Sequence, residues 1–175
     1  MNELQKHEHY MKLALEQAAK AGAVGEVPIG AIIVYKDEVI AAASNLRETT
    51  QNAVMHAELM AIQQACENIG SWRLEETTLY VTLEPCPMCA GAILQSRIPT
   101  VIYGARDKKA GCVHSLYELL NDERFNHQCE VIEGVLAEQC GQILTDFFRK
   151  LRTLKKEQKK ERKLLEGQRI DNLSS

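Results

Sequence analysis

Two short clusters near the middle of the chain have side chains that can bind a metal and move a proton. Residues 56–58 read His-Ala-Glu, and residues 85–89 read Pro-Cys-Pro-Met-Cys. Two thiolates and one imidazole suit a tetrahedral zinc ion, and three protein ligands leave its fourth position open for water, as in catalytic zinc sites. A carboxylate beside that water can act as a base. The spacing predicts hydrolytic attack on an electrophilic carbon, with His56, Cys86 and Cys89 as zinc ligands.

The placement of these residues in helices determines whether they can act together. If Pro87 starts a helix, the sulfurs of Cys86 and Cys89 lie one turn apart at its N-terminus, where backbone N–H groups and the helix dipole favour thiolates. On a regular helix, residues two apart such as His56 and Glu58 point in roughly opposite directions. We therefore expect the helix to begin at about His56, which lets Glu58 serve as the proton carrier.

Other chemistry is open to the same residues. A structural zinc site needs a fourth ligand, and the residues that could supply one are Cys112, Cys129, His114 and His127. A redox-active Cys pair would leave the His-Ala-Glu cluster without a role. The even number of cysteines could also form three disulfides, although we expect reduced thiols in a chain without an export signal.

Composition indicates a globular protein with one domain and an extension. The chain has 175 residues, of which 45% are hydrophobic and 26% are charged. No apolar run approaches the ~18 residues of a membrane span, so we expect no membrane association. The first residues lack a basic start followed by an apolar stretch. We therefore expect no secretory signal and a cytoplasmic protein.

Charge is distributed unevenly along the chain. Residues 149–163 contain nine basic and two acidic residues, a net charge of +7, whereas the remainder carries −10. A basic segment attached to an acidic body indicates a polyanionic partner. We expect residues 1–154 to form the catalytic domain and residues 155–175 to form a basic, partly frayed helical extension.

Hydrophobic periodicity predicts alternating strands and helices after an initial hairpin. This order is typical of an α/β sandwich whose sheet is antiparallel at first and parallel where helices cross over. Residues 45–55 lack a clear period and are predicted to be a loop. The predicted helices are 5–21, 56–68, 88–95, a short one near 115–120, and one from 136 that is expected to fray after Gly167. The predicted strands are 29–35, 39–44, 78–83, 101–103 and 130–135.

The two clusters form the pattern H-x-E … P-C-x-x-C, which resembles the signature of the zinc-dependent nucleobase deaminases. Further matching stretches span the chain to about residue 152, and they resemble the tRNA-adenosine branch of that family: 26–31, 56–58, 82–93, 103–107 and 147–149. One departure is residues 51–55, where the family often has Asp-Pro-Thr/Ser-Ala. The resemblance implies a cytidine-deaminase-like fold, a three-layer α/β/α sandwich around a mixed five-stranded sheet.

The resemblance also implies an activity and roles for individual residues. One Zn²⁺ per subunit would be held by His56, Cys86 and Cys89, and Glu58 would shuttle the proton. The reaction would convert adenosine to inosine at wobble position 34 of a tRNA anticodon loop, in a homodimeric enzyme. The substrate-binding residues implied are Asn45 for the base or ribose, Val27, Pro28 and Ala57 for the pocket, Asp107 for flanking nucleotides and Arg149 for phosphate.

Two rival functions fit the zinc pattern. A deaminase of a small substrate such as guanine or cytidine would have no evident use for the basic extension. A non-catalytic zinc protein that binds RNA would have no use for Glu58. Identifying which substrate the purified protein deaminates tests the first rival. Measuring activity after replacement of Glu58 tests the second.

Overall fold

A computed structural model, which describes residues 1–174, contains one mixed sheet of five strands with the order β2-β1-β3-β4-β5. Strand β1 (Gly30–Tyr35) pairs antiparallel with β2 (Glu38–Ser44) and with β3 (Thr77–Leu83). Strands β4 (Thr100–Ala105) and β5 (Glu130–Glu133) then continue the sheet in parallel with β3. The predicted mixed sheet, antiparallel first and parallel later, is confirmed.

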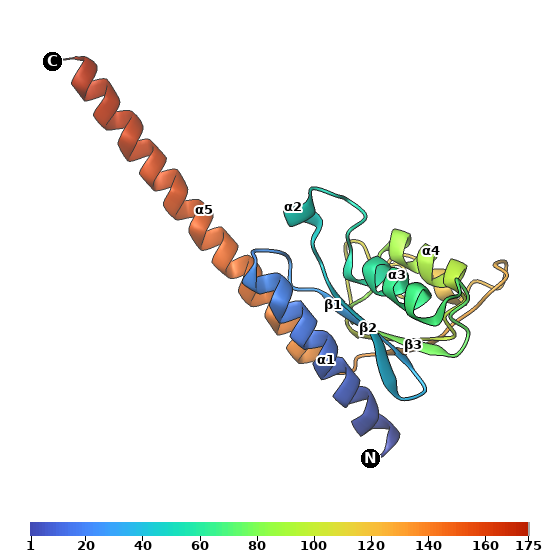
Figure 1. The fold of residues 1–175 in the computed structure, drawn as a ribbon. Coiled ribbons are helices and arrows are strands. Elements are labelled where there is room, and N and C mark those ends of the chain that lie inside the picture. Colours follow the sequence, from blue (N-terminus) through green and yellow to red (C-terminus); the bar gives the residue numbers. More distant parts are fainter. Residues whose placement is uncertain (175) are drawn as a thin grey trace.

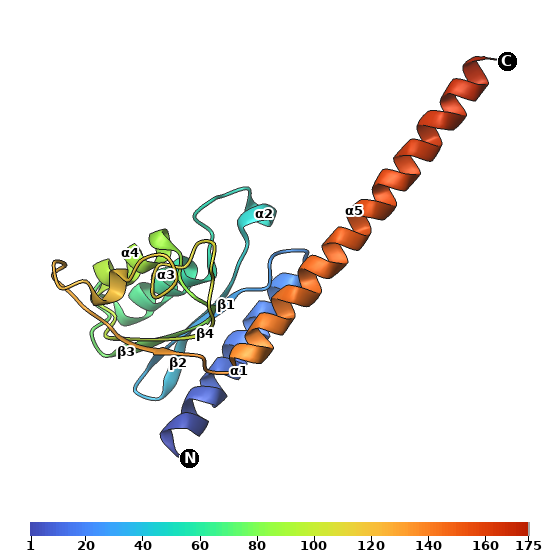
Figure 2. The same cartoon turned by 180° about the vertical axis from the view of Figure 1, so that it is seen from behind.

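Helices cover both faces of this sheet. Helices α1 (Glu3–Ala23) and α5 (Ala137–Leu173) lie side by side on one face, and α3 (Ala57–Ile69) and α4 (Pro87–Ser96) lie on the other (Figure 1, Figure 2). The predicted three-layer α/β/α sandwich is therefore confirmed. Two short elements complete the described chain, namely α2 (Arg47–Thr50) and the 3₁₀ helix η1 (Leu119–Asn121). No helix in residues 1–174 is long and apolar enough to cross a membrane.

Strand β1 is apolar throughout because each of its faces lies in a core. Ala31 and Ile33 pack into the cluster beneath α3 and α4, whereas Ile32 and Val34 pack into the cluster beneath α1 and α5. Successive strand residues point to opposite faces. A strand covered on both sides consequently shows a continuous hydrophobic run rather than an alternating one.

The parallel pair β3 and β4 determines where the loops of the site meet. The ends of the two strands are in register, with Leu83 opposite Ala105. The chain leaves β3 towards the Cys cluster and leaves β4 towards the Arg-Asp-Lys-Lys stretch at 106–109. Both loops therefore emerge at the carboxyl ends of neighbouring strands, the position at which open α/β sheets bind ligands.

Several predicted boundaries differ from the structure. The predicted loop at 45–55 contains helix α2, and the helix predicted near 115–120 is only the 3₁₀ turn η1. The last strand ends at Glu133 instead of 135. Helix α5 continues past Gly167 to Leu173, where the sequence suggested a frayed end. These differences lie where short-range pattern is weakest, in polar segments and at the chain end.

Gly30 allows α1 to approach the start of β1 closely. A Cβ atom built there would lie 2.1 Å from the Ala14 carbonyl oxygen and 2.4 Å from the Ala18 nitrogen, both backbone atoms. We predict that Gly30→Ala lowers the free energy of unfolding by roughly 3 kcal/mol, because backbone cannot move aside as a side chain can. Urea unfolding measures this value.

The matched control is Gly141→Ala in α5, where an added Cβ meets no atom within 4 Å. Alanine favours the helix interior over glycine, so this variant should gain about 0.5–1 kcal/mol. Equal stability of the two variants would contradict the close packing at Gly30.

Candidate active site

His56 and Glu58 converge because the helix begins between them. His56 is the N-cap of α3 and has an extended backbone, with φ −82° and ψ 148°, and the helix proper starts at Ala57. The His56 side chain makes no capping hydrogen bond to its own helix. The imidazole is therefore free to turn towards the Cys cluster. The prediction that the helix begins here is confirmed.

The cysteines occupy the equivalent position on a second helix. Cys86 is the N-cap of α4, Pro87 is at the helix N-terminus and Cys89 follows within the first turn. His56 Nδ1 lies 3.7 Å from Cys86 Sγ and 3.6 Å from Cys89 Sγ. All three potential ligand atoms lie within 4.8 Å of one another. Two helix N-termini thus bring the predicted ligands together.

These separations fit a tetrahedral zinc ion. Nitrogen and sulfur ligands at about 2.0 and 2.3 Å from zinc lie about 3.5 Å apart at the tetrahedral angle. Within residues 1–174 the cluster contains three His, Cys, Asp or Glu donors and no more. The geometry and the donor types therefore suit one ion with a position left open to the cavity.

The residues proposed as a fourth ligand are engaged elsewhere. The Cys129 thiol donates to the Ile98 carbonyl at 3.1 Å, and a ring nitrogen of His127 lies 2.7 Å from the same oxygen. His114 hydrogen-bonds Tyr103, and the Cys112 thiol donates to the Ala110 carbonyl. All six cysteines, each in the described part of the chain, are free thiols. The alternatives of a closed structural zinc site and of disulfides are therefore not supported.

The two thiols of the cluster are joined by a hydrogen bond. The Cys89 thiol donates to the Cys86 sulfur, which lowers the pKa of Cys86 to about 4. The same hydrogen bond, together with burial, raises the pKa of Cys89. The N-terminus of α4 also favours a thiolate at this position.

Glu58 is a buried carboxyl group beside the sulfurs. Only 4% of its surface is exposed. Burial raises the pKa of Glu58, and a hydrogen bond with Cys89 opposes that rise. A carboxyl group with a raised pKa holds a proton more readily near neutral pH, which suits proton transfer in both directions.

A cavity of about 600 Å³ opens over this cluster. The predicted site residues that line it are Val27, Asn45, His56, Ala57, Glu58, Cys86 and Asp107. Three predicted residues lie outside the lining: Cys89 is fully buried behind it, Pro28 is buried beside Val27, and Arg149 is exposed on α5. The cavity thus collects most of the predicted residues from five separate parts of the chain.

Sequence reasoning missed other lining residues. Leu144 and Phe148 of α5 line the cavity, although their helical spacing suggested an ordinary core face. The cationic lining residues Arg47, Arg106, Lys108 and Lys109 were also missed, and the charge run at 106–109 could have indicated the last three. Glu84 at the end of β3 was missed as well. Burial opposes its ionisation, but hydrogen bonds from His114, Ser115 and Val113 outweigh burial and lower the pKa of Glu84 to about 2.

Comparison with known proteins agrees with this geometry. Residues 5–152 match the family described as MafB19-like deaminase. The tRNA-specific adenosine deaminase of Bacillus subtilis (strain 168) is 57% identical over 153 residues, which cover 87% of this chain and 95% of that protein. The chain belongs to the tRNA-specific adenosine deaminase family.

Solved structures place this member of the family among deaminases. A chain from a study of A-to-I editing by tRNA:A34 deaminases at the wobble position of transfer RNA matches with a TM-score of 0.75 and 42% identity, covering 78% of this chain and 99% of the other. A guanine deaminase from Bacillus subtilis matches with a TM-score of 0.55 and 37% identity, covering 61% and 66%. The predicted cytidine-deaminase-like fold and deaminase family are confirmed.

Hydrogen bonds to a residue far away in the sequence hold α2, which immediately precedes the 51–55 stretch that departs from the usual family pattern. The buried Glu26 carboxylate accepts hydrogen bonds from the backbone N–H groups of Glu48 and Thr49 and from the Thr49 hydroxyl. These N–H groups belong to α2, whose own N-cap, Leu46, offers no side-chain acceptor. Glu26 therefore substitutes for the missing cap and fixes the loop beside the cavity.

Asn45 shapes the same region through its amide. Its Nδ2 donates to the Val27 carbonyl at 3.1 Å, and its Oδ1 accepts from the Arg47 backbone N–H at 3.3 Å. The side chain thus joins two segments that line the cavity.

We predict that Glu26→Ala lowers the free energy of unfolding by about 2 kcal/mol, because it leaves two N–H groups of α2 without an acceptor. Backbone amide exchange at Glu48 and Thr49 should accelerate in parallel. Glu48→Ala, which removes an exposed carboxylate from the same helix, should change stability by less than about 0.5 kcal/mol. Unchanged exchange in Glu26→Ala would contradict the capping role.

Proposed function

We propose that the protein hydrolyses adenosine to inosine at wobble position 34 of a tRNA anticodon loop, with one Zn²⁺ per chain. The observation that carries this proposal is the His56, Cys86 and Cys89 triad with buried Glu58 at the floor of a cavity. The support for the substrate is the 57% identity to a tRNA-specific adenosine deaminase.

Glu58 acts as the proton carrier in this proposal. Zinc bound by the triad would lower the pKa of a water molecule at its open position. The Glu58 carboxylate would take a proton from the attacking water, whose oxygen bonds to C6, and would deliver that proton to the amino nitrogen as the C6–N bond breaks and ammonia leaves. The second water proton passes to N1 of the ring, so that adenosine and water give inosine and ammonia and Glu58 returns to its starting state.

The cavity suits one base removed from its stack. Chemistry on a base requires it to be unstacked, and loop bases can be splayed out at modest energy. We propose that Val27 and Ala57 form the wall beside the base, with the buried Pro28 next to Val27 in the chain, and that Asn45 contacts the base or ribose. Asp107, on the opposite loop, would meet the flanking nucleotides.

Cations around the cavity would contact the backbone of such a loop. Arg47, Lys108 and Lys109 line it, and phosphate contacts of this kind position RNA without reading its sequence. Arg106 is already bound by the Glu133 carboxylate through two hydrogen bonds of 2.8 and 2.9 Å. Arg47 and Arg149 each make only one longer ion pair, at 3.6 Å with Glu48 and at 3.5 Å with Asp146. We therefore assign phosphate contact to Arg47, Lys108, Lys109 and Arg149.

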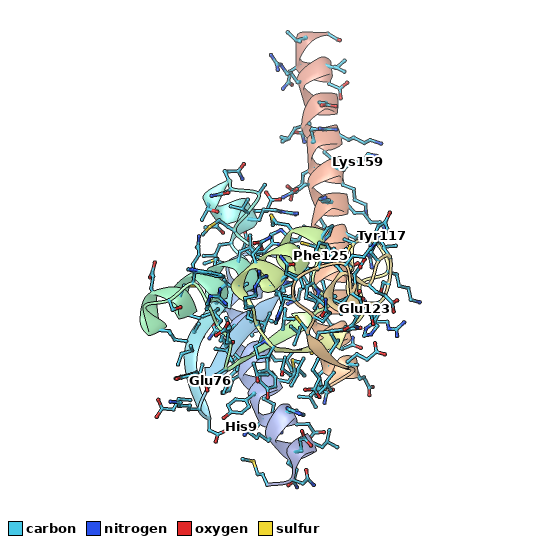
Figure 3. The ribbon with its side chains drawn as sticks, turned by 90° about the vertical axis from the view of Figure 1, so that its right-hand side faces the viewer. His9, Glu76, Tyr117, Glu123, Phe125 and Lys159 are labelled. Atoms are coloured by element: carbon cyan, nitrogen blue, oxygen red, sulfur yellow. The ribbon has the colours of Figure 1, made fainter. Side chains whose placement is uncertain are left out.

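Helix α5 supports a second set of phosphate contacts. It projects away from the domain beyond about residue 154, and Lys159 lies on the projecting part (Figure 1, Figure 3). Arg152, Lys156, Lys159 and Lys163 are exposed and follow the cavity-lining Phe148 at spacings of three or four residues. Residues so spaced share one helix face. This basic stripe therefore extends in line from the cavity, and we propose residues 155–175 as an RNA-binding extension of a 1–154 deaminase domain.

We also propose that the protein is a homodimer and acts in the cytoplasm. Between β4 and β5 the side chains of Leu116, Tyr117 and Phe125 are exposed (Figure 3). Exposed apolar side chains gathered on one segment support a protein interface. The cytoplasmic assignment follows from the proposed tRNA substrate.

The activity is tested with an anticodon stem-loop RNA carrying adenosine at the wobble position and, separately, with free bases. We expect the wobble adenosine of the stem-loop RNA to be converted to inosine, which is read as guanosine on sequencing, and the free bases to remain unchanged. We predict that Glu58→Gln lowers this rate roughly 10³-fold because the amide cannot carry the proton, with zinc retained near one per chain. Ammonia released only from free bases would refute the tRNA substrate, and unchanged activity in Glu58→Gln would refute its role.

Two cysteine variants complete that test. Cys86→Ala should lose both zinc and activity because two protein ligands remain. Cys66→Ala removes a thiol outside the cluster and should keep both. Zinc retained in Cys86→Ala would contradict the proposed ligand set.

We predict that deleting residues 155–175 weakens RNA binding and reduces its salt dependence, with zinc content unchanged. The paired variant Lys159→Gln/Lys163→Gln should lower the slope of log affinity against log salt by roughly 1.5, at 0.7–0.9 per lost phosphate contact. Lys12→Gln/Lys20→Gln removes the same charge from exposed positions on α1 and should leave the slope unchanged. Equal slopes in all proteins would refute the role of the extension.

A further inference from the structure

Glu84 is a buried carboxylate that the proposed reaction does not use. It follows the end of β3, two residues before the metal-ligating Cys86, and 2% of its surface is exposed. Isolated buried carboxylates are costly, so such a group requires partners. The partners of Glu84 all come from one loop, residues 107–115, which follows β4.

Five hydrogen bonds join this loop to the Glu84 carboxylate. One oxygen, Oε2, accepts from the backbone N–H groups of Val113, His114 and Ser115 at 3.1, 2.9 and 2.9 Å. The other, Oε1, accepts from the Asp107 N–H at 3.1 Å and from the Ser115 hydroxyl. The carboxylate thus holds both ends of the loop.

Gly111 shows that the loop is wrapped closely around this carboxylate. A Cβ at position 111 would lie 2.3 Å from Glu84 Cδ and 2.4 Å from its Oε2. Between the anchored ends, the Asp107 side chain closes a turn. Its Oδ1 accepts hydrogen bonds from the backbone N–H groups of Lys109 and Ala110 at 3.0 and 3.2 Å. That turn lines the cavity. The Asp107 N–H bond to Glu84 is therefore the link between a buried charge and the cavity wall.

We propose that Glu84 is a positioning residue that fixes the 107–110 turn as the substrate-facing wall of the cavity. A turn that already has its bound conformation before RNA binds loses little conformational entropy on binding. Such preorganisation strengthens binding of the substrate and of the transition state equally. Loss of the preorganised turn therefore raises KM and leaves kcat nearly unchanged. The metal ligands are held separately, by the starts of α3 and α4.

Glu84→Gln tests the proposal because the amide keeps one acceptor oxygen and replaces the other with a donor. The oxygen can retain the three N–H bonds at the Oε2 position, and the Ser115 hydroxyl can reverse to accept from the new NH₂. The Asp107 N–H alone is left facing a donor. We expect faster amide exchange at Asp107 but not at residues 113–115, zinc near one per chain, and a KM for the anticodon stem-loop about tenfold higher with kcat within about threefold.

The controls separate positioning from general damage. Glu130→Gln makes the same change at an exposed carboxylate on β5 and should alter neither exchange nor KM. Ser115→Ala removes one donor and should raise KM about twofold, which provides a second test should Glu84→Gln not fold. Unchanged KM with Asp107 still protected, or an equal fall in kcat and zinc content, would overturn the proposal.

The kinetic part of this test rests on the proposed function, whereas the exchange part does not. If the unmodified protein fails to deaminate the stem-loop, the proposed function is refuted. Exchange at Asp107 in Glu84→Gln then still decides whether Glu84 holds the turn.

Discussion

The site depends on two residues that start helices without capping them. An N-cap side chain usually accepts a hydrogen bond from the first turn of its own helix, but His56 and Cys86 do not. Their backbones are extended, so each side chain leaves its helix and faces the other. The N-termini of α3 and α4 thus supply the three clustered ligands, and a helix N-terminus stabilises thiolate charge. Ligand convergence, thiolate stability and the placement of Glu58 all follow from this arrangement.

Buried carboxylates hold the walls around that centre. Glu26 fixes the loop that precedes His56, and Glu84 fixes the loop that follows β4. A third carboxylate, that of the exposed Glu133, holds Arg106 at the cavity and also accepts a hydrogen bond from Tyr103 of β4. In the two buried cases one acidic side chain satisfies several donors of a connecting loop, which for Glu26 includes the short helix α2. Such loops cannot rely on apolar burial, so charge-assisted hydrogen bonds give them a defined shape.

The metal centre could be predicted from sequence because its information is local. Cys-x-x-Cys and His-x-Glu each span only a few residues, and the convergence of His56 with Glu58 requires only that the helix begin at His56. Glu84 and Glu26 could not be found this way, since their partners lie more than 20 residues away in segments without periodicity. Leu144 and Phe148 have the spacing of a core face, and nothing local indicates that part of this face borders a cavity.

Helix α5 combines a wall of the cavity and the basic extension in a single rigid element. With a rise of about 1.5 Å per residue, Lys163 lies about 22 Å along the axis from Phe148. A flexible tail of the same composition would reach phosphates over a wide range of distances. Under the proposed function, a continuous helix would instead fix the separation between a bound base and an anion that the extension contacts. Length, in addition to charge, would then distinguish one RNA from another, because a strand without a phosphate at that separation would gain nothing from the extension.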